Sequence, residues 1–153
     1  MKRKLTIDTT IVKPMIVILI AIFFWECKKE KDNEIYIDPS LLLNHEWTLT
    51  SIQDKNTNQI IVYPENITQK ESILFTDSLT IIFSCACNHG WGKYRINYNR
   101  ITFEDCYKTL MYCTNLQWED YFLENLDKAY QFDIKANQLV IRSNGAYNLI
   151  FNY

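Results

Sequence analysis

The residues of this sequence that could carry chemistry are its cysteines. Cys85 and Cys87 are two positions apart, His89 follows two positions later, and Cys106 and Cys113 lie further along the chain. Two thiols and an imidazole at alternate positions, completed by two more thiols, could bind zinc or cuprous copper. The spacing is not that of a standard zinc site, so we predict no metal centre. An even number of cysteines in an exported domain favours disulfides instead.

Cys85 and Cys87 cannot easily bond each other, because side chains two positions apart in an extended chain point the same way. We therefore expect the disulfides Cys87–Cys113 and Cys85–Cys106, with the crossed pairing as the alternative. Each bridge would stabilise the domain by about 2–4 kcal/mol, mainly by restricting the unfolded chain.

The N-terminus provides the reason to expect export. Positive charges at positions 2–4 precede the uninterrupted apolar run Met15–Trp25, and Cys27 follows it, ahead of a charged stretch. This order is typical of a signal peptide that ends at a lipid-modified cysteine. The apolar run would rise only about 16 Å as a helix, roughly half of a hydrocarbon core, so it is short for a membrane span. Glu26 is a poor match to the small residue expected before such a cysteine, and an uncleaved anchor is the alternative.

These features divide the chain into three parts. Residues 1–26 are the predicted lipoprotein signal peptide, and residues 27–38 are a charged tether that follows lipidated Cys27. Residues 39–153 are long enough for one domain with its own core. We expect the protein to be a monomer, held by acyl chains to a membrane of the bacterial envelope, on the periplasmic side or the outer surface.

Hydrophobic periodicity predicts a mostly β (α+β) domain. After Cys113, Thr114 and Gln117 match a capping box, and apolar residues then recur at helical spacing from Trp118 to Ala129. Strands are expected from alternation and turn signals. They cover 47–52, 60–63, 72–75, 79–83, 92–98, 101–103, 130–134, 138–141 and 147–153. The economical architecture is a curved antiparallel sheet or barrel-like shell with one helix packed on it.

No catalytic or cofactor-binding residues are predicted. The two histidines, His45 and His89, are expected on the surface at the start of a strand and in a loop, and three glycines cannot build a phosphate-binding loop. The net charge of −2 gives no basic field for nucleic acid. We therefore expect a protein that is not an enzyme, needs no cofactor and does not bind nucleic acid.

Several short motifs resemble those of the META domain family of HslJ-like envelope proteins, across roughly residues 41–153. The more specific ones are Cys87-Asn88 followed by Gly92-Lys-Tyr94, and Thr109-Leu-Met111-Tyr-Cys113. The others are strand-like segments such as Trp47-Thr-Leu49, Ile81-Ile-Phe83 and Leu149-Ile-Phe151.

The resemblance implies a small, mostly antiparallel β domain with one helix, exported and often a lipoprotein, linked to heat or envelope stress and antibiotic tolerance. It supports the Cys87–Cys113 pair, because those positions match the family's recurring cysteines. Cys85 and Cys106 lie outside the usual pattern, which suggests an extra bridge. Ala86 stands where the family has glycine, which argues against a close backbone turn there.

Two functions remain as expectations. The first is a non-enzymatic envelope lipoprotein that binds a protein or envelope component through exposed aromatics such as Trp91 and Tyr94, since Trp and Tyr often anchor interfaces. The alternative is a lipocalin-like carrier of a small apolar ligand, or a hydrolase inhibitor. An internal cavity would favour the carrier, and a filled core would favour surface binding.

Overall fold

A computed structural model describes residues 35–67, 69–112 and 116–153. The predicted signal peptide, lipidated Cys27 and most of the tether lie outside these residues. So do Cys113 and the Thr114 cap. Within the described residues, no helix has the length and apolar character needed to cross a membrane.

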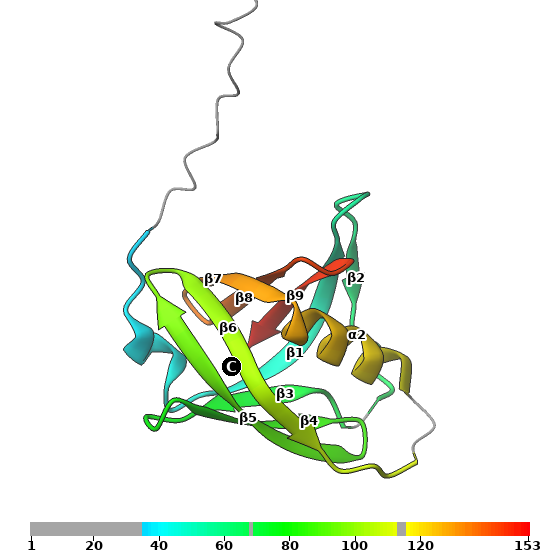
Figure 1. The fold of residues 1–153 in the computed structure, drawn as a ribbon. Coiled ribbons are helices and arrows are strands. Elements are labelled where there is room, and N and C mark those ends of the chain that lie inside the picture. Colours follow the sequence, from blue (N-terminus) through cyan, green and yellow to red (C-terminus); the bar gives the residue numbers. More distant parts are fainter. Residues whose placement is uncertain (1–34, 68, 113–115) are drawn as a thin grey trace, which may run out of the picture. The chain divides into compact units, whose positions relative to one another are not determined.

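The described residues form one antiparallel sheet that closes into a barrel with a single α-helix, which confirms the predicted fold class (Figure 1). The 3-10 helix η1 (Pro39–Leu42) comes first, and α2 (Leu116–Asp127) lies between the sixth and seventh strands. The strands are β1 (Glu46–Asp54), β2 (Ile60–Val62), β3 (Ser72–Phe75), β4 (Thr80–Cys85), β5 (Asn88–Asn97), β6 (Arg100–Lys108), β7 (Ala129–Lys135), β8 (Gln138–Ser143) and β9 (Tyr147–Asn152).

The barrel runs β1-β3-β4-β5-β6-β7-β8-β9, and antiparallel pairing of β9 with β1 closes it. The short β2 pairs with β1 outside this ring. Between β6 and β7 the pairing runs through Arg100 and Gln131, and the Phe132 N–H donates to the Asn99 carbonyl at 2.8 Å. Pairing therefore links all eight ring strands, although the β6–β7 seam is limited to one residue pair.

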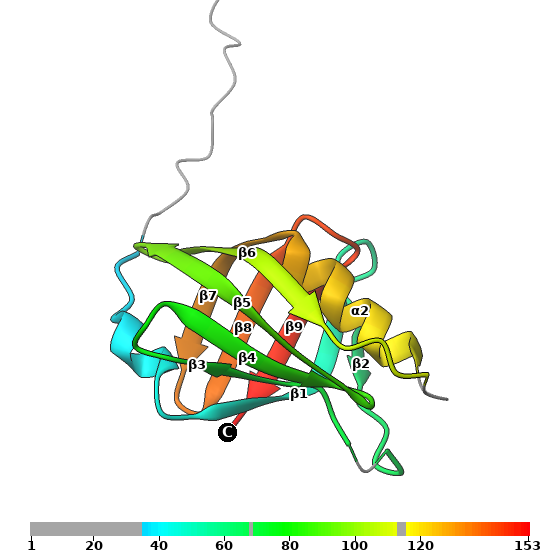
Figure 2. The same ribbon diagram turned by 60° about the horizontal axis from the view of Figure 1, so that its bottom comes forward.

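The two ends of the barrel are covered by different helices (Figure 2). Because neighbouring strands run in opposite directions, β4, β6 and β8 finish at the end where β5, β7 and β9 begin. Helix α2 packs there against β4, β6, β8 and β9. At the other end η1 buries Leu42, whose carbonyl accepts a 3.0 Å hydrogen bond from Trp47 Nε1. The Asp38 carboxylate caps η1 by accepting from the Ser40 N–H, and Pro39 occupies its first turn.

Large aromatic side chains fill the barrel. Phe122 of α2 is completely buried, with its ring centroid 5.9 Å from that of Phe83 and 6.2 Å from that of Phe151. Each such side chain contributes about 1.5–3 kcal/mol by burial. The largest fully buried side chains are Trp47, Phe75, Phe83, Phe122, Phe132 and Phe151. A core packed in this way favours binding on the outer surface over carriage of a ligand inside the barrel.

Two strands, β5 and β6, extend beyond the predicted limits by four residues or more at one end. β5 begins at Asn88 rather than at Gly92, so His89 lies in a strand and not in a loop. β6 continues past Phe103 to Lys108. An irregularity in β6, described below, breaks the alternation that would have identified its second half.

Candidate functional site

A stripe of exposed apolar side chains crosses three neighbouring strands on the outside of the barrel. Trp91 of β5 lies directly opposite Ile82 of β4 on one side and Tyr107 of β6 on the other. These side chains are 52–58% exposed, and the Trp91 and Tyr107 ring centroids are 6.2 Å apart with the rings tilted by 37°. Both rings are therefore accessible from solvent.

A β-bulge shapes this surface. In β5, Trp91 pairs with Tyr107 of β6, and Lys93 pairs with Glu104. The two β5 residues are two positions apart, whereas their β6 partners are three positions apart. β6 thus carries an additional residue here, and Asp105 adopts a positive φ of 51°. Bulges re-aim side chains in this way and are frequent beside functional sites.

The bulge brings Asp105 to the edge of the stripe, where its carboxylate accepts a 2.9 Å hydrogen bond from Lys93 Nζ. The hydrogen bond and charge of Lys93 lower the pKa of Asp105, and the same contact raises the pKa of Lys93. Both side chains are more than half exposed, so their ion pair adds little to stability. The stripe and this pair border a groove of about 340 Å³, the outer-face groove, lined by Thr80, Ile81, Ile82, Trp91, Gly92, Lys93, Asp105 and Tyr107.

Tyr94, the second predicted surface aromatic, is buried. It is 3% exposed, its hydroxyl donates to the Thr76 carbonyl at 2.9 Å, and its ring meets Phe75 edge-on at 5.1 Å. The prediction that it binds at the surface is therefore wrong. Trp91 and Tyr94 are an odd number of positions apart, and successive side chains of a strand point to opposite faces.

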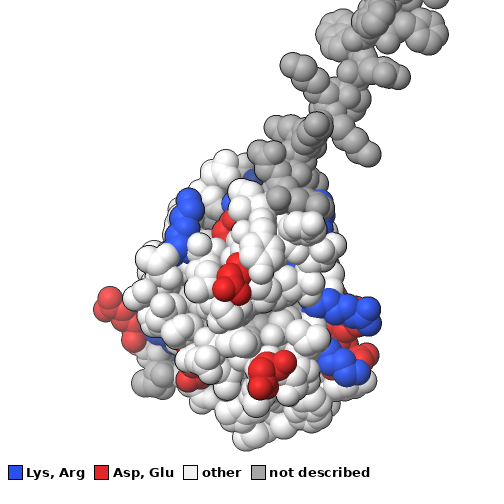
Figure 3. Space-filling model, turned by 90° about the vertical axis from the view of Figure 1, so that its left-hand side faces the viewer, with Lys and Arg blue, Asp and Glu red and all other residues white. Residues whose placement is uncertain are grey.

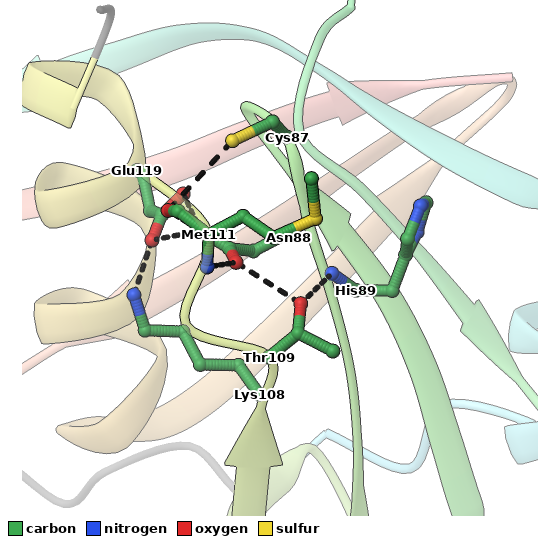
Figure 4. Close-up of polar contacts among 7 residues, drawn as sticks. All are labelled: Cys87, Asn88, His89, Lys108, Thr109, Met111 and Glu119. Atoms are coloured by element: carbon green, nitrogen blue, oxygen red, sulfur yellow. Dashed lines mark hydrogen bonds and ion pairs between the residues drawn. The ribbon is translucent and has the colours of Figure 1, made fainter. Parts of the chain in front are cut away.

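A second polar arrangement, the Asn88 network, lies at the end of the barrel covered by α2 (Figure 4). We define it as Asn88, Lys108, Thr109, Met111 and Glu119. Asn88 is 1% exposed. Its amide oxygen accepts from the Met111 N–H at 2.8 Å and from the Thr109 hydroxyl at 3.0 Å. Its amide nitrogen donates to the Met111 carbonyl and to both Glu119 carboxylate oxygens, each at 3.2 Å.

Glu119 joins the helix to this network. Its carboxylate is completely buried and forms an ion pair with Lys108 Nζ, at the end of β6. Two donors therefore compensate the buried charge, as burial of a carboxylate requires. Asp120, the next residue, is exposed, as expected for neighbours on a helix.

The Asn88 network fixes the backbone of a segment that displays apolar side chains. Leu110 and Tyr112 are 90% and 91% exposed, and Met111 between them is also exposed. The network thus connects two motifs, Cys87-Asn88 and Thr109–Met111, that are distant in sequence.

Two more ionisable groups are buried near Glu119. Glu71 is 0% exposed, and burial raises the pKa of its carboxyl. Neither Glu71 oxygen makes a hydrogen bond of normal geometry, although the Tyr63 hydroxyl and the Ala86 amide are close enough to oppose the rise. Burial, reinforced by the charge of Glu119, raises the pKa of the Cys85 thiol to about 12.

Two of the cysteines do not pair as predicted. Cys85 and Cys106 are free thiols, so the Cys85–Cys106 bridge is wrong, and the crossed pairing fails with it. Cys85 points into the core at the end of β4, whereas Cys106 lies in the bulged part of β6. Cys113, the predicted partner of Cys87, lies outside the described residues, so that disulfide stays a prediction.

The segment between Cys85 and Asn88 is a tight turn rather than an extended chain. Cys85 pairs with Asn88 across it, and Ala86 takes a φ of 44°. The close turn forms with alanine in place of glycine, contrary to the expectation from the sequence. Because the chain turns here, the expectation that Cys85 and Cys87 point the same way, which assumed an extended chain, does not apply.

The donors considered for a metal are likewise separated. Cys85 is in the core, whereas His89 is on the outer face, where its Nδ1 lies 3.1 Å from the Ser84 hydroxyl. Within the described ranges, no group of three or more His, Cys, Asp or Glu side chains is placed to hold a metal ion.

Sequence reasoning missed most of these site residues. Ile82 and Tyr107 lie in strands whose registers were not known, and Lys108 lies beyond the predicted end of its strand. Glu119 stands in the first turn of α2, where a carboxylate is favourable even without burial, so its type and position do not indicate a core residue. The signal available in the sequence was the pair of family-like motifs that contain Asn88 and Met111.

Charge is not concentrated on the side of the molecule seen in Figure 3. Uncharged residues cover most of that face, and the charged ones form small groups.

Beside the outer-face groove, Arg95 pairs with Glu104 at 2.9 Å, next to the Lys93–Asp105 pair. The site is therefore an apolar stripe with a locally neutral, zwitterionic border.

The fold and these two arrangements define a small closed β-barrel with a helix over one end and an exposed aromatic site on its wall. The META domain family model matches residues 40–152. The chain therefore belongs to the META domain family.

Solved structures share the fold. A protein from Burkholderia xenovorans, determined by NMR, has 19% identity and a TM-score of 0.59, covering 82% of this chain and 97% of its own. A second NMR structure has 23% identity and a TM-score of 0.58, covering 76% and 94%. A duf4847 family protein from Bacteroides vulgatus ATCC 8482 has 13% identity and a TM-score of 0.57, covering 74% and 94%. No curated protein is significantly similar to this chain.

Proposed function

We propose that this protein is a non-enzymatic envelope lipoprotein whose META domain binds a protein or envelope component through the outer-face groove. The observation that carries the proposal is the exposure of Trp91 between Ile82 and Tyr107 on three hydrogen-bonded strands. Clustered Trp and Tyr side chains anchor many interfaces, because they bury large area at low conformational cost. The rigid sheet beneath holds them in one geometry without a ligand.

The leader supports the location of this binding function. A positively charged start, an apolar run and Cys27 together favour export and acylation, and the acyl chains would attach the protein to the membrane. The Cys87–Cys113 disulfide would suit an oxidising compartment. The family resemblance adds a role in stress tolerance to this proposal.

Two variants test the two parts separately. Cys27→Ala should release the protein from the membrane fraction and leave its circular dichroism unchanged, because Cys27 precedes the folded domain. Membrane retention unchanged by Cys27→Ala would point to an uncleaved anchor. Trp91→Ala should keep membrane association but lose partners captured from envelope fractions. If Trp91→Ala captures the same partners as the native protein, the groove is not the binding site.

Stress tolerance has its own test. A deletion strain that expresses the Trp91→Ala form should survive heat or antibiotic exposure no better than the uncomplemented deletion strain. Full rescue by this variant would separate stress tolerance from the groove.

A further inference from the structure

We infer that the ligand of the outer-face groove is a neutral oligosaccharide, whose sugar rings lie against Trp91 and Tyr107 while their hydroxyls bond Lys93 and Asp105. This inference rests on the proposed binding function of the groove. It adds the chemical class of the ligand.

The two rings provide the apolar part of such a site. Trp91 is 57% exposed and Tyr107 is 58% exposed, and their ring centroids are 6.2 Å apart, so one ligand can contact both rings. An aromatic face carries partial negative charge, and the C–H bonds on one face of a pyranose ring carry slight positive charge. Sugar rings therefore match this surface in both flatness and polarity.

The Lys93–Asp105 pair favours a neutral polar ligand over a charged or purely apolar one, because the opposite charges of the pair give no net attraction to either sign. A donor and an acceptor lie 2.9 Å apart at the groove edge, and together they carry no net charge. The attraction of an anion to Lys93 is offset by Asp105, and the attraction of a cation to Asp105 is offset by Lys93. A hydrocarbon would cover polar groups without bonding them, which costs free energy. Neighbouring hydroxyls of a sugar can donate to Asp105 and accept from Lys93.

The size and position of the groove favour a small ligand over a protein. Its volume of about 340 Å³ falls within the range of small-molecule pockets. A stable protein interface buries about 800 Å² on each partner, much more than three exposed side chains offer. The groove also lies on the outer face of β4–β5–β6, where the strands are paired with one another and present side chains to a ligand.

Calorimetric titration of the purified full chain with triacetylchitotriose and with cellotriose tests the inference. We expect saturable binding of at least one, weakened at least about tenfold by Trp91→Ala. The double variant Lys93→Gln, Asp105→Asn should weaken binding while leaving Tm unchanged, because that pair is exposed. Tyr36→Ala, which removes an exposed aromatic outside the groove, is the matched control and should bind as the native protein does.

The outcomes separate this inference from the proposed function. If neither saccharide binds but Trp91-dependent capture of an envelope protein persists, the saccharide assignment is wrong and the binding function stands. Saccharide binding unaffected by Trp91→Ala would also overturn the assignment. If neither saccharide binding nor capture depends on Trp91, both proposals fail.

Discussion

Replacement of Asn88 by alanine should destabilise the domain more than any surface change of similar size. The Asn88 amide bonds the Met111 backbone twice, the Thr109 hydroxyl once and the buried Glu119 carboxylate. Its removal deletes all of these contacts at once and leaves a cavity next to a buried charge.

The size of this destabilisation depends on which of the former hydrogen-bond partners of Asn88 can bond to water instead. Met111 is exposed, so its backbone groups can rehydrate, and each lost bond there costs about 1 kcal/mol or less. Glu119 is 0% exposed, and the loss of a hydrogen bond to a buried charged group costs about 1.5–3 kcal/mol. The sum is about 3 kcal/mol, which for a domain of this size lowers Tm by about 10–15 °C.

Thermal unfolding followed by circular dichroism measures this change, with Asn97→Ala as the matched control. Asn97 lies in the same strand with its side chain exposed, so its replacement should change stability by less than about 0.5 kcal/mol. Chymotrypsin provides a second measurement, because the released segment contains Leu110 and Tyr112 and should be cut faster in Asn88→Ala. Equal Tm values for the two variants, with equal cleavage, would refute the assignment of Asn88 as the residue that fixes this segment.

Three further predictions concern the same end of the barrel. Ala86→Gly should raise stability by about 0.5–1 kcal/mol in urea unfolding, because glycine adopts the observed positive φ without strain; a loss would contradict this. In the native protein a thiol reagent should modify exposed Cys106. Buried Cys85, whose pKa is raised to about 12, should react only after unfolding. Labelling of Cys85 before unfolding would show that it is accessible. The Glu71 pKa is raised above 4.5 in the folded state, so its neutral form is favoured there, and stability declines as pH rises through the raised value. Glu71→Gln should therefore match the native protein below about pH 4.5 and exceed it at pH 7, and parallel pH profiles would contradict this.

The sequence was informative where one periodicity covered a whole element. Trp47 and Leu49 alternate with threonines and lie in β1, and Trp118, Phe122 and Leu126 recur at helical spacing and face the core from α2. In these segments burial alone decides the structure, so the pattern of apolar residues is sufficient.

The sequence was uninformative where one residue changes the register. The bulge at Asp105 shifts the second half of β6, so Tyr107 could not be assigned to the face that carries Trp91. Local patterns report which residues prefer burial, but strand pairing is set by contacts between distant segments. The prediction of a Cys85–Cys106 disulfide failed for a similar reason, because the number of cysteines does not reveal that Cys85 faces the core.

The burial of Glu119 could not be derived from helix rules, because a carboxylate in a first helical turn is favourable even when exposed. Its burial depends on Lys108 and Asn88, which approach it from two strands. Residues that bond one another across the fold can therefore be recognised in the sequence as motifs, but the sequence does not reveal which residues they bond.

The outer-face groove and the Asn88 network have different consequences for substitution. Groups of the Asn88 network are buried and mutually bonded, so changes there should act first on stability. Trp91 and Tyr107 are exposed on strands whose pairing does not depend on their side chains, so changes there should act on binding and leave folding nearly unchanged. Large buried aromatic side chains occupy the barrel interior, which favours the outer surface as the place for a binding role. Variants at the groove that retain Tm but lose ligand, beside Asn88 variants that lose Tm, would demonstrate this separation of roles.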